Sequence, residues 1–156
     1  MWPARARNVD YVARMPIHAL TNDVVERARD GAVALVATGG EPLRCCLRNA
    51  RAGEAILLFS YEPPIGDGRS PYREVGAVFA HAAPCEAPTG GAYPAAWLGK
   101  PQVLRAYDAR GWIVDALVHD GKTPEPEIAR LFAQESVVEI HSRNVAYGCF
   151  MFRITR

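Results

Sequence analysis

The stretch VVEIHSRNVAYGCFMFRIT, residues 137–155, decides the fold of this chain because it has the pattern of a β-hairpin. Phe150, Phe152 and Ile154 alternate with less apolar residues, which is the period of a strand with one buried face. The run VVEIHS has the same two-residue alternation and supplies the partner strand. We therefore predict that the chain ends in an antiparallel pair whose phenylalanine face is buried.

His141 and Cys149 flank the SRNVAYG loop of this hairpin and share its more polar face, so we predict that they are cross-strand neighbours with Cβ atoms about 5 Å apart. An imidazole beside a thiol can deprotonate it and give a nucleophile and an acid at neutral pH. The alternative is that Cys149 is a small buried residue and His141 donates to a loop carbonyl. Asn144 either orients the imidazole or makes a turn hydrogen bond.

Working outward from the hairpin, further strands are predicted for AVALVAT (32–38), LRCCLRN (43–49), AILLFSY (55–61), VGAVFAHA (75–82), QVLRAY (102–107) and WIVDALV (112–118). Cap residues and stop signals predict helices over about 22–30 and from Pro124 to near Gln134. The fold class is therefore α+β: a mostly antiparallel sheet of about six to eight strands, with two short helices packed on one side. We expect a single domain over residues 1–156, whose first 20 residues are loosely ordered.

The sequence DARG between two of these strands is typical of a type I turn with a left-handed glycine at Gly111. This turn pairs Asp108 with Trp112, and an unbroken ladder then pairs Arg105 with Asp115. Arg105 would in that case have a structural partner.

Composition excludes several classes of protein. The 156 residues are 49% hydrophobic and 22% charged with a formal net charge of +1, which is ordinary for a globular chain and gives no field to attract nucleic acid. No apolar run approaches the roughly 20 residues that span a bilayer, and no secretory signal is present, so a cytoplasmic location is expected. The four cysteines are then free thiols. Cys45 and Cys46, adjacent on an expected strand, would point to opposite faces. The oligomeric state stays open, with a homodimer among the options.

The segment 62–73, EPPIGDGRSPYR, carries three prolines and two glycines and is predicted to be a long loop. Loops of about a dozen residues in compact domains often form binding loops or lids. Tyr72 and Arg73 at its end can clamp a carboxylate or phosphate, because a guanidinium presents a bidentate fork. The alternative is that Arg73 pairs with Glu62 or Glu74.

His81, Cys85, His141 and Cys149 offer two imidazoles and two thiols, which is the ligand set of a tetrahedral zinc or iron site. Their spacings, H-x3-C and H-x7-C, lack the C-x2-C knuckle of common zinc motifs, and His81 continues an apolar strand face where a core histidine is ordinary. No phosphate-binding loop or dinucleotide fingerprint is present. We therefore expect no organic cofactor and leave a metal as an alternative.

Five segments together resemble an uncharacterised bacterial family, domain of unknown function 1203: RCCLRNARAGEAILLFSYEP, SPYR, VFAHAAPC, LRAYD and IHSRNVAYGCF. The resemblance runs from about Pro42 to Arg156 and implies a shared fold and residue pattern, without a reaction. The shared positions are Cys46, Arg48, Tyr61, Ser70, Pro71, Tyr72, Arg73, His81, Cys85, Arg105, Tyr107, His141, Asn144, Gly148 and Cys149. This chain departs from the family at Leu43, where many members have cysteine, and at Asn49, where they have aspartate.

We expect the site in a pocket between the 62–73 loop, the loop around Cys85 and the terminal hairpin. Our leading hypothesis is a small-molecule enzyme in which His141 is the general base or acid and Cys149 the nucleophile. The residues expected to hold its small anionic substrate are Tyr72, Arg73, Asn144, Tyr61, His81, Cys85 and Arg105. The alternatives are a non-catalytic ligand-binding or redox-sensing module, and a metal-binding protein.

Overall fold

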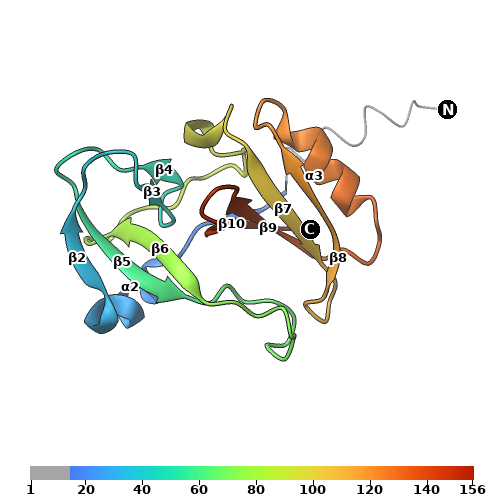
Figure 1. The fold of residues 1–156 in the computed structure, drawn as a ribbon, viewed down its shortest axis with the longest axis horizontal. Helices are drawn as coiled ribbons and strands as arrows, with labels where there is room; N and C mark the ends of the chain where they lie inside the picture. Colours follow the sequence, from blue (N-terminus) through green and yellow to red (C-terminus); the bar gives the residue numbers. More distant parts are fainter. Residues whose placement is uncertain (1–14) are drawn as a thin grey trace.

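The computed structural model describes residues 15–156 and contains two five-stranded sheets, which lie beside each other in Figure 1. Sheet A has the order β1 (Ile17–His18), β10 (Phe150–Thr155), β9 (Glu139–Asn144), β7 (Gln102–Tyr107) and β8 (Ile113–His119). Sheet B has the order β2 (Val33–Val36), β5 (Ala55–Tyr61), β6 (Gly76–His81), β3 (Pro42–Leu43) and β4 (Arg48–Asn49). All pairs are antiparallel except β3 with β6.

Each sheet has its own helix and its own core. The helical elements are α2 (Asn22–Ala28), the 3-10 turns η1 (Arg29–Gly31) and η2 (Ala95–Trp97), and α3 (Pro124–Phe132). Leu131 of α3 belongs to the apolar cluster of sheet A, whereas Val25 of α2 belongs to that of sheet B. The predicted α+β class and both helices are confirmed. The prediction of one sheet of six to eight strands with both helices on one side is wrong, because period-two alternation reveals a strand but not its sheet.

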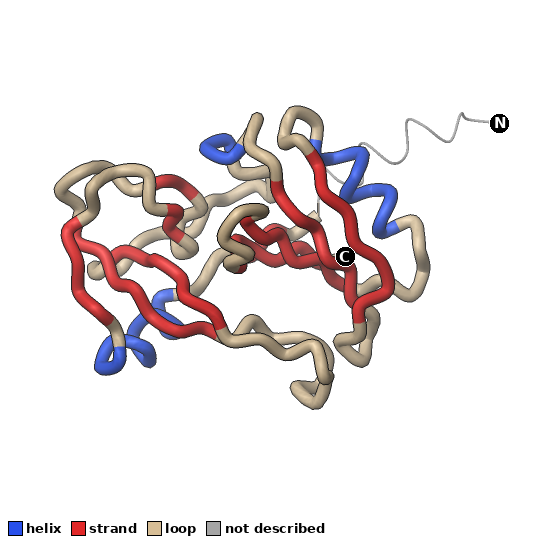
Figure 2. Tube along the Cα trace, in the orientation of Figure 1, coloured by secondary structure: helices blue, strands red, loops and turns tan. Residues whose placement is uncertain are grey.

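The chain passes from one sheet to the other through irregular segments, which Figure 2 shows in tan. One of them joins β6 of sheet B to β7 of sheet A and is interrupted by the 3-10 turn η2. Figure 1 shows the resulting arrangement, with α2 beside sheet B and α3 beside β8 of sheet A. Residues between β6 and β7 are therefore placed near both sheets.

The segment 43–49 is not one strand, as predicted, but the short strands β3 and β4 joined by a tight turn. The N–H of Leu47 donates to the carbonyl of Leu43 at 3.0 Å, and Leu47 has a φ of 55°. Left-handed backbone is uncommon for leucine, and here the buried side chain holds the residue in place. Cys45 and Cys46 therefore lie in a turn, where adjacent side chains need not point to opposite faces.

The predicted turn before β8 is confirmed, since Asp108 N–H donates to Trp112 O at 2.9 Å. The predicted pairing of Arg105 with Asp115 is wrong. A β-bulge adds one residue to β8 next to the turn, so Arg105 lies opposite Ala116 instead.

The terminal hairpin is also confirmed, but its register differs from the prediction. β9 continues to Asn144, whose N–H donates to Cys149 O at 2.9 Å, so the connecting loop is only residues 145–148. A second bulge then shifts β10, and His141 lies opposite Arg153. The prediction that His141 and Cys149 are cross-strand neighbours is therefore wrong.

Within residues 15–20, β1 pairs with β10, and Met15 and Leu20 are buried. Residues 1–14 of the expected loose segment lie outside the described part. Within residues 15–156 no helix has the length and apolar character needed to cross a membrane.

Candidate metal centre

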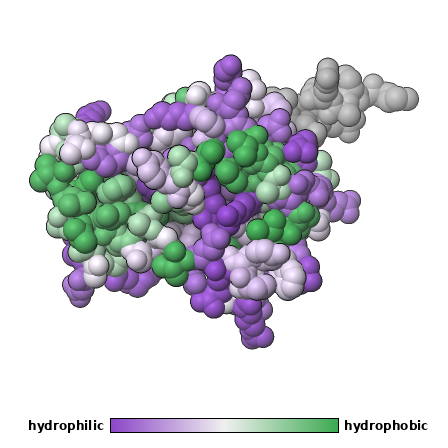
Figure 3. Space-filling model, viewed as in Figure 1, coloured by the Kyte–Doolittle hydropathy of each residue, from purple (hydrophilic) through white to green (hydrophobic). Residues whose placement is uncertain are grey.

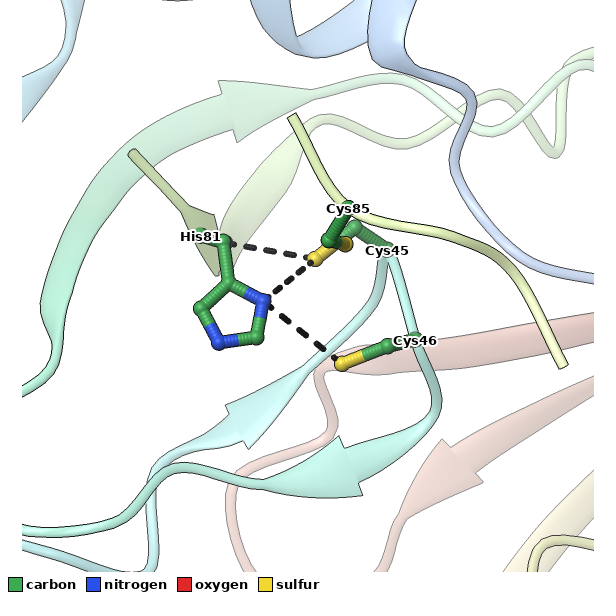
Figure 4. Close-up of side chains that lie close together, drawn as sticks. All are labelled: Cys45, Cys46, His81 and Cys85. Atoms are coloured by element: carbon green, nitrogen blue, oxygen red, sulfur yellow. Dashed lines mark hydrogen bonds between the residues drawn. The ribbon is translucent and has the colours of Figure 1, made fainter. Parts of the chain in front are cut away.

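Three cysteines and one histidine lie close together at the edge of sheet B (Figure 4). Cys45 and Cys46 come from the β3–β4 turn, His81 is the last residue of β6, and Cys85 lies in the following loop. The ligand atoms of all four residues lie within 4.8 Å of one another. Cys45 is buried and the other three are half-buried.

The separations inside this cluster correspond to those of a tetrahedral metal site. His81 Nδ1 lies 3.5 Å from Cys45 Sγ and 3.7 Å from Cys46 Sγ. With Zn–S near 2.3 Å and Zn–N near 2.0–2.1 Å, the N–S edge of a tetrahedron is about 3.6 Å. The two distances fit a common centre without rearrangement of the backbone.

Backbone contacts hold the turn against β6. The N–H of His81 donates to Cys45 Sγ at 3.2 Å, and the N–H of Arg44 donates to Phe79 O at 2.9 Å. The second bond belongs to the parallel pairing of β3 with β6, in which Leu43 lies beside Phe79. Together with the left-handed Leu47, these bonds aim two adjacent thiols at one imidazole.

Cys85, the fourth residue of the cluster, is hydrogen-bonded to the start of helix α2. Thr21 caps α2, and the side chain of Asn22 at the start of that helix accepts the N–H of Cys85 at 3.1 Å. Burial raises the pKa of the Cys85 thiol. The cluster therefore joins three separate segments: a turn, a strand end and a loop anchored on α2.

The outward nitrogen of His81 faces an ion pair. Nε2 lies 3.1 Å from an Arg48 guanidinium nitrogen and 3.5 Å from Glu54 Oε1. Arg48 binds both oxygens of Glu54 at 2.7 and 3.0 Å, and this pairing holds the pKa of Glu54 at about 2. A guanidinium can only donate, so Nε2 accepts from Arg48 and the proton of the neutral ring lies on Nδ1, toward the thiols. Metal binding at Nδ1 requires the other tautomer, whose Nε2–H has the Glu54 carboxylate as its acceptor.

Without a cation, the cluster favours the protonated form of its thiols. Contact with Cys45, followed by burial, raises the pKa of Cys46. A divalent cation reverses this balance, because a coordinating thiol loses its proton. The chemistry available to the cluster is thus binding of a thiophilic metal.

His141, the expected acid or base, lies elsewhere. Its side chain is 1% exposed and packs between the rings of Tyr107 and Phe150, with centroid distances of 4.8 and 5.3 Å. Within the described residues neither ring nitrogen makes a hydrogen bond, and Nε2 lies 3.5 Å from Glu139 Oε1. Burial lowers the pKa of His141, so the neutral imidazole is favoured.

Cys149 and Asn144 lie in the hairpin turn. The Cys149 thiol faces Tyr147 O at 3.7 Å, and Asn144 Oδ1 accepts the N–H of Tyr147 at 3.2 Å. Asn144 therefore makes the turn hydrogen bond that was its alternative role. Neither residue contributes to the metal cluster.

Tyr72 and Arg73 lie at the end of the long loop but already have partners. Tyr72 packs edge-on against Trp112 with ring centroids 5.8 Å apart. Arg73 pairs with Glu62 at 2.9 Å, which was its alternative partner.

Tyr61 and Arg105 lie near the space between the sheets. Tyr61 packs against Phe150 and lines a pocket of about 330 Å³, which also includes Glu74, Arg143 and Cys149. Arg105 pairs with Glu74 at 3.1 Å. This pocket adjoins the long loop and the hairpin, but Cys85 is not part of its lining. We expected one pocket between the 62–73 loop, the loop around Cys85 and the terminal hairpin. Instead, Cys85 belongs to the metal cluster, and the pocket beside the long loop and the hairpin is separate from it.

The sequence identified His81 and Cys85 as candidate ligands but paired them with the wrong residues. Their partners, Cys45 and Cys46, were assigned to a strand with diverging side chains. The available signal was the presence of two adjacent cysteines upstream of the H-x3-C pair, with Cys45 36 residues before His81.

A family model described as "Protein of unknown function (DUF1203)" matches residues 40–156. The matched region includes all four residues of the cluster. The comparisons with curated proteins and with solved structures found no match.

Proposed function

Because the chain belongs to the DUF1203 family of proteins of unknown function, we propose its role from its own side chains: it binds one zinc ion through Cys45, Cys46, Cys85 and His81. The observation that carries this proposal is the convergence of four ligand atoms within 4.8 Å, with N–S separations of 3.5 and 3.7 Å. Three thiolates and one imidazole are a common ligand set of structural zinc.

The charges around the cluster also support a divalent cation. Three thiolates bound to Zn²⁺ carry a net charge of about −1, because each coordinating thiol is deprotonated. Arg48 places a positive charge 3.1 Å from the outer nitrogen of His81. Glu54 accepts the hydrogen bond that this nitrogen donates once Nδ1 binds the metal.

The site is structural rather than catalytic in this proposal, because four protein ligands leave no open position for water or substrate. Its ligands join the β3–β4 turn, the end of β6 and the loop that Asn22 anchors to α2. Sheet B is therefore the part of the chain whose folding depends on the ion.

Metal analysis of the purified protein tests the proposal. We expect about one zinc per chain, and a thiolate-to-metal charge-transfer band after exchange with Co²⁺. Cys46→Ser should lose both signals, whereas Cys149→Ser, a cysteine outside the cluster, should keep them. A wild-type chain that neither retains nor takes up zinc, or a Cys46→Ser chain with full occupancy, would falsify the proposal.

An enzyme that uses His141 and Cys149 is the alternative function. The two residues lie on different parts of the hairpin, and His141 is enclosed by aromatic rings. Catalysis by this pair would require the imidazole to leave the core. Hydrolytic activity toward small esters that is lost in both His141→Gln and Cys149→Ser would favour the enzyme over the zinc proposal.

A further inference from the structure

Arg44 carries a buried charge without a carboxylate partner. The residue is 2% exposed, and its guanidinium donates to two backbone carbonyls, Phe150 O at 2.8 Å and Pro42 O. Within residues 15–156 no acidic side chain forms an ion pair with it. A guanidinium keeps its charge in proteins, so Arg44 is a buried cation.

The other partly buried arginines of the described residues are paired. Within residues 15–156, four have side chains that are about one-third exposed or less, and each reaches a carboxylate: Arg48 to Glu54 at 2.7 Å, Arg105 to Glu74 at 3.1 Å, Arg143 to Glu74 at 2.9 Å and Arg153 to Glu139 at 2.7 Å. Burying an ion is costly unless a counter-ion compensates. Arg44 is the most buried of the five and lacks that compensation.

Arg44 lines a pocket of about 490 Å³ on sheet B. Apolar side chains of β5 and β6 form one side, namely Leu58, Ala77 and Phe79, and the hairpin loop around Tyr147 forms the other. Figure 3 shows that apolar surface gathers at the left of the view, where Figure 1 places sheet B. Mostly apolar pockets of this size with a few polar groups are typical small-molecule sites.

Glu41 is the acidic residue of the pocket lining, and its carboxylate is already engaged. It accepts hydrogen bonds from Thr38 N at 2.7 Å, Thr38 Oγ1 at 2.8 Å and Gly39 N at 2.9 Å. These bonds hold the pKa of Glu41 at about 2. An anionic ligand group is therefore repelled from Glu41 and attracted to Arg44. A ligand with one anionic end is expected to bind in a single orientation.

We propose that this pocket binds a small carboxylic acid with an apolar body, its carboxylate paired with Arg44 and its body against Leu58 and Phe79. A guanidinium that donates Nε and one Nη to carbonyls has the other Nη left to bind a carboxylate. The ligand supplies the counter-ion that the chain does not. The site is separate from the zinc proposal and needs no metal ligand.

Binding of two matched pairs of probes tests the inference: benzoate with benzamide, and hexanoate with hexanamide. We expect each acid to bind at least about tenfold more tightly than its amide by titration calorimetry, because only the acid carries the charge. Ala77→Leu fills the pocket from β6 and should abolish acid binding. Ala116→Leu, a matched exposed alanine on β8, should leave it unchanged.

Arg44→Met should remove the preference for acid over amide, and Arg44→Lys should retain part of it. If Arg44→Met does not fold, Ala77→Leu decides the matter. Equal binding of acid and amide, full acid binding by Ala77→Leu, or failure of both acids to bind overturns the proposal. Inorganic phosphate that binds as tightly as benzoate overturns the assignment to carboxylic acids.

Discussion

Each sheet contains a histidine whose Nε2 lies near a glutamate: the half-buried His81 in sheet B and the buried His141 in sheet A. Nε2 of His81 lies 3.5 Å from Glu54 Oε1, and Nε2 of His141 lies 3.5 Å from Glu139 Oε1. Each glutamate is also paired with an arginine, at 2.7 Å in both cases. Both histidines therefore have a glutamate near Nε2 that is itself paired with an arginine.

The histidines differ in what the other nitrogen meets. Nδ1 of His81 faces the thiols of Cys45 and Cys46, whereas Nδ1 of His141 makes no hydrogen bond within the described residues. Aromatic rings surround His141 instead. A histidine with a carboxylate behind it is thus not a metal ligand by itself. The side chains in front of it decide the chemistry, and four changes can test this comparison.

Chelation of the metal should have the largest effect. With free zinc about 1,000-fold above its Kd, removing the ion lowers the free energy of unfolding by about 4 kcal/mol. Hydrogen exchange should accelerate at β3, β4 and the end of β6, while amides around His141 in sheet A keep their protection. Urea unfolding with and without chelator measures the first effect, and Cys46→Ser, which should not respond to chelator, is its control. Equal curves for the wild type would refute a structural role.

Replacing each histidine should have the second-largest effect and should distinguish the two sites. Structural zinc sites supply about 10–16 kcal/mol in total, so losing one of four ligands in His81→Gln should cost about 2.5–4 kcal/mol of zinc binding, roughly 70- to 700-fold in Kd. His141→Gln should leave the zinc affinity unchanged. Competition with a chromogenic chelator measures both. A similar loss in the two variants would break the comparison.

The carboxylates behind the histidines give a smaller contrast. Glu54→Gln should weaken zinc binding by about 10–100-fold, because partners of this kind orient the ligand imidazole. Glu139→Gln is the matched change on sheet A and should have no effect on zinc. An unchanged affinity in Glu54→Gln would mean that Arg48, rather than the carboxylate, sets the orientation of His81.

Much of the local structure could be predicted from sequence, because it depends on neighbouring residues. The helix after Thr21, the turn after Asp108 and the terminal hairpin all follow from caps, glycines and two-residue alternation. The registers could not be predicted. A bulge in β8 and another in β10 each shift the pairing by one residue, and no residue type marks them.

The metal cluster shows why half of a site can be predicted. His81 and Cys85 were candidates because of their chemistry and close spacing. Cys45 and Cys46 required knowledge of a turn in which Leu47 takes a left-handed conformation, and leucine is an unexpected residue there. The parallel pairing of β3 with β6, which brings the turn to His81, is a long-range contact that period-two alternation does not encode.

His141 supplies the smallest and most specific test of the comparison. Because burial lowers its pKa, the unfolded chain binds a proton more readily than the folded chain below the ordinary histidine pKa of about 6.5. Stability is therefore fully present above pH 6.5 and decreases as pH falls below it, by at most about 1.4 kcal/mol per pH unit for this one group. The facing Glu139 reduces this effect, while Arg143 and Arg153 reinforce it.

The difference in unfolding free energy between wild type and His141→Gln, measured from pH 7.5 to 5, isolates that contribution because the other histidines cancel. We expect the wild type to lose stability relative to the variant as pH falls, and zinc occupancy at pH 7.5 to be equal in both. A pH-independent difference would mean that the Glu139 contact offsets the cost of burial. The two histidines would then differ only in the thiols that face His81, and the enclosure of His141 would have no energetic consequence of its own.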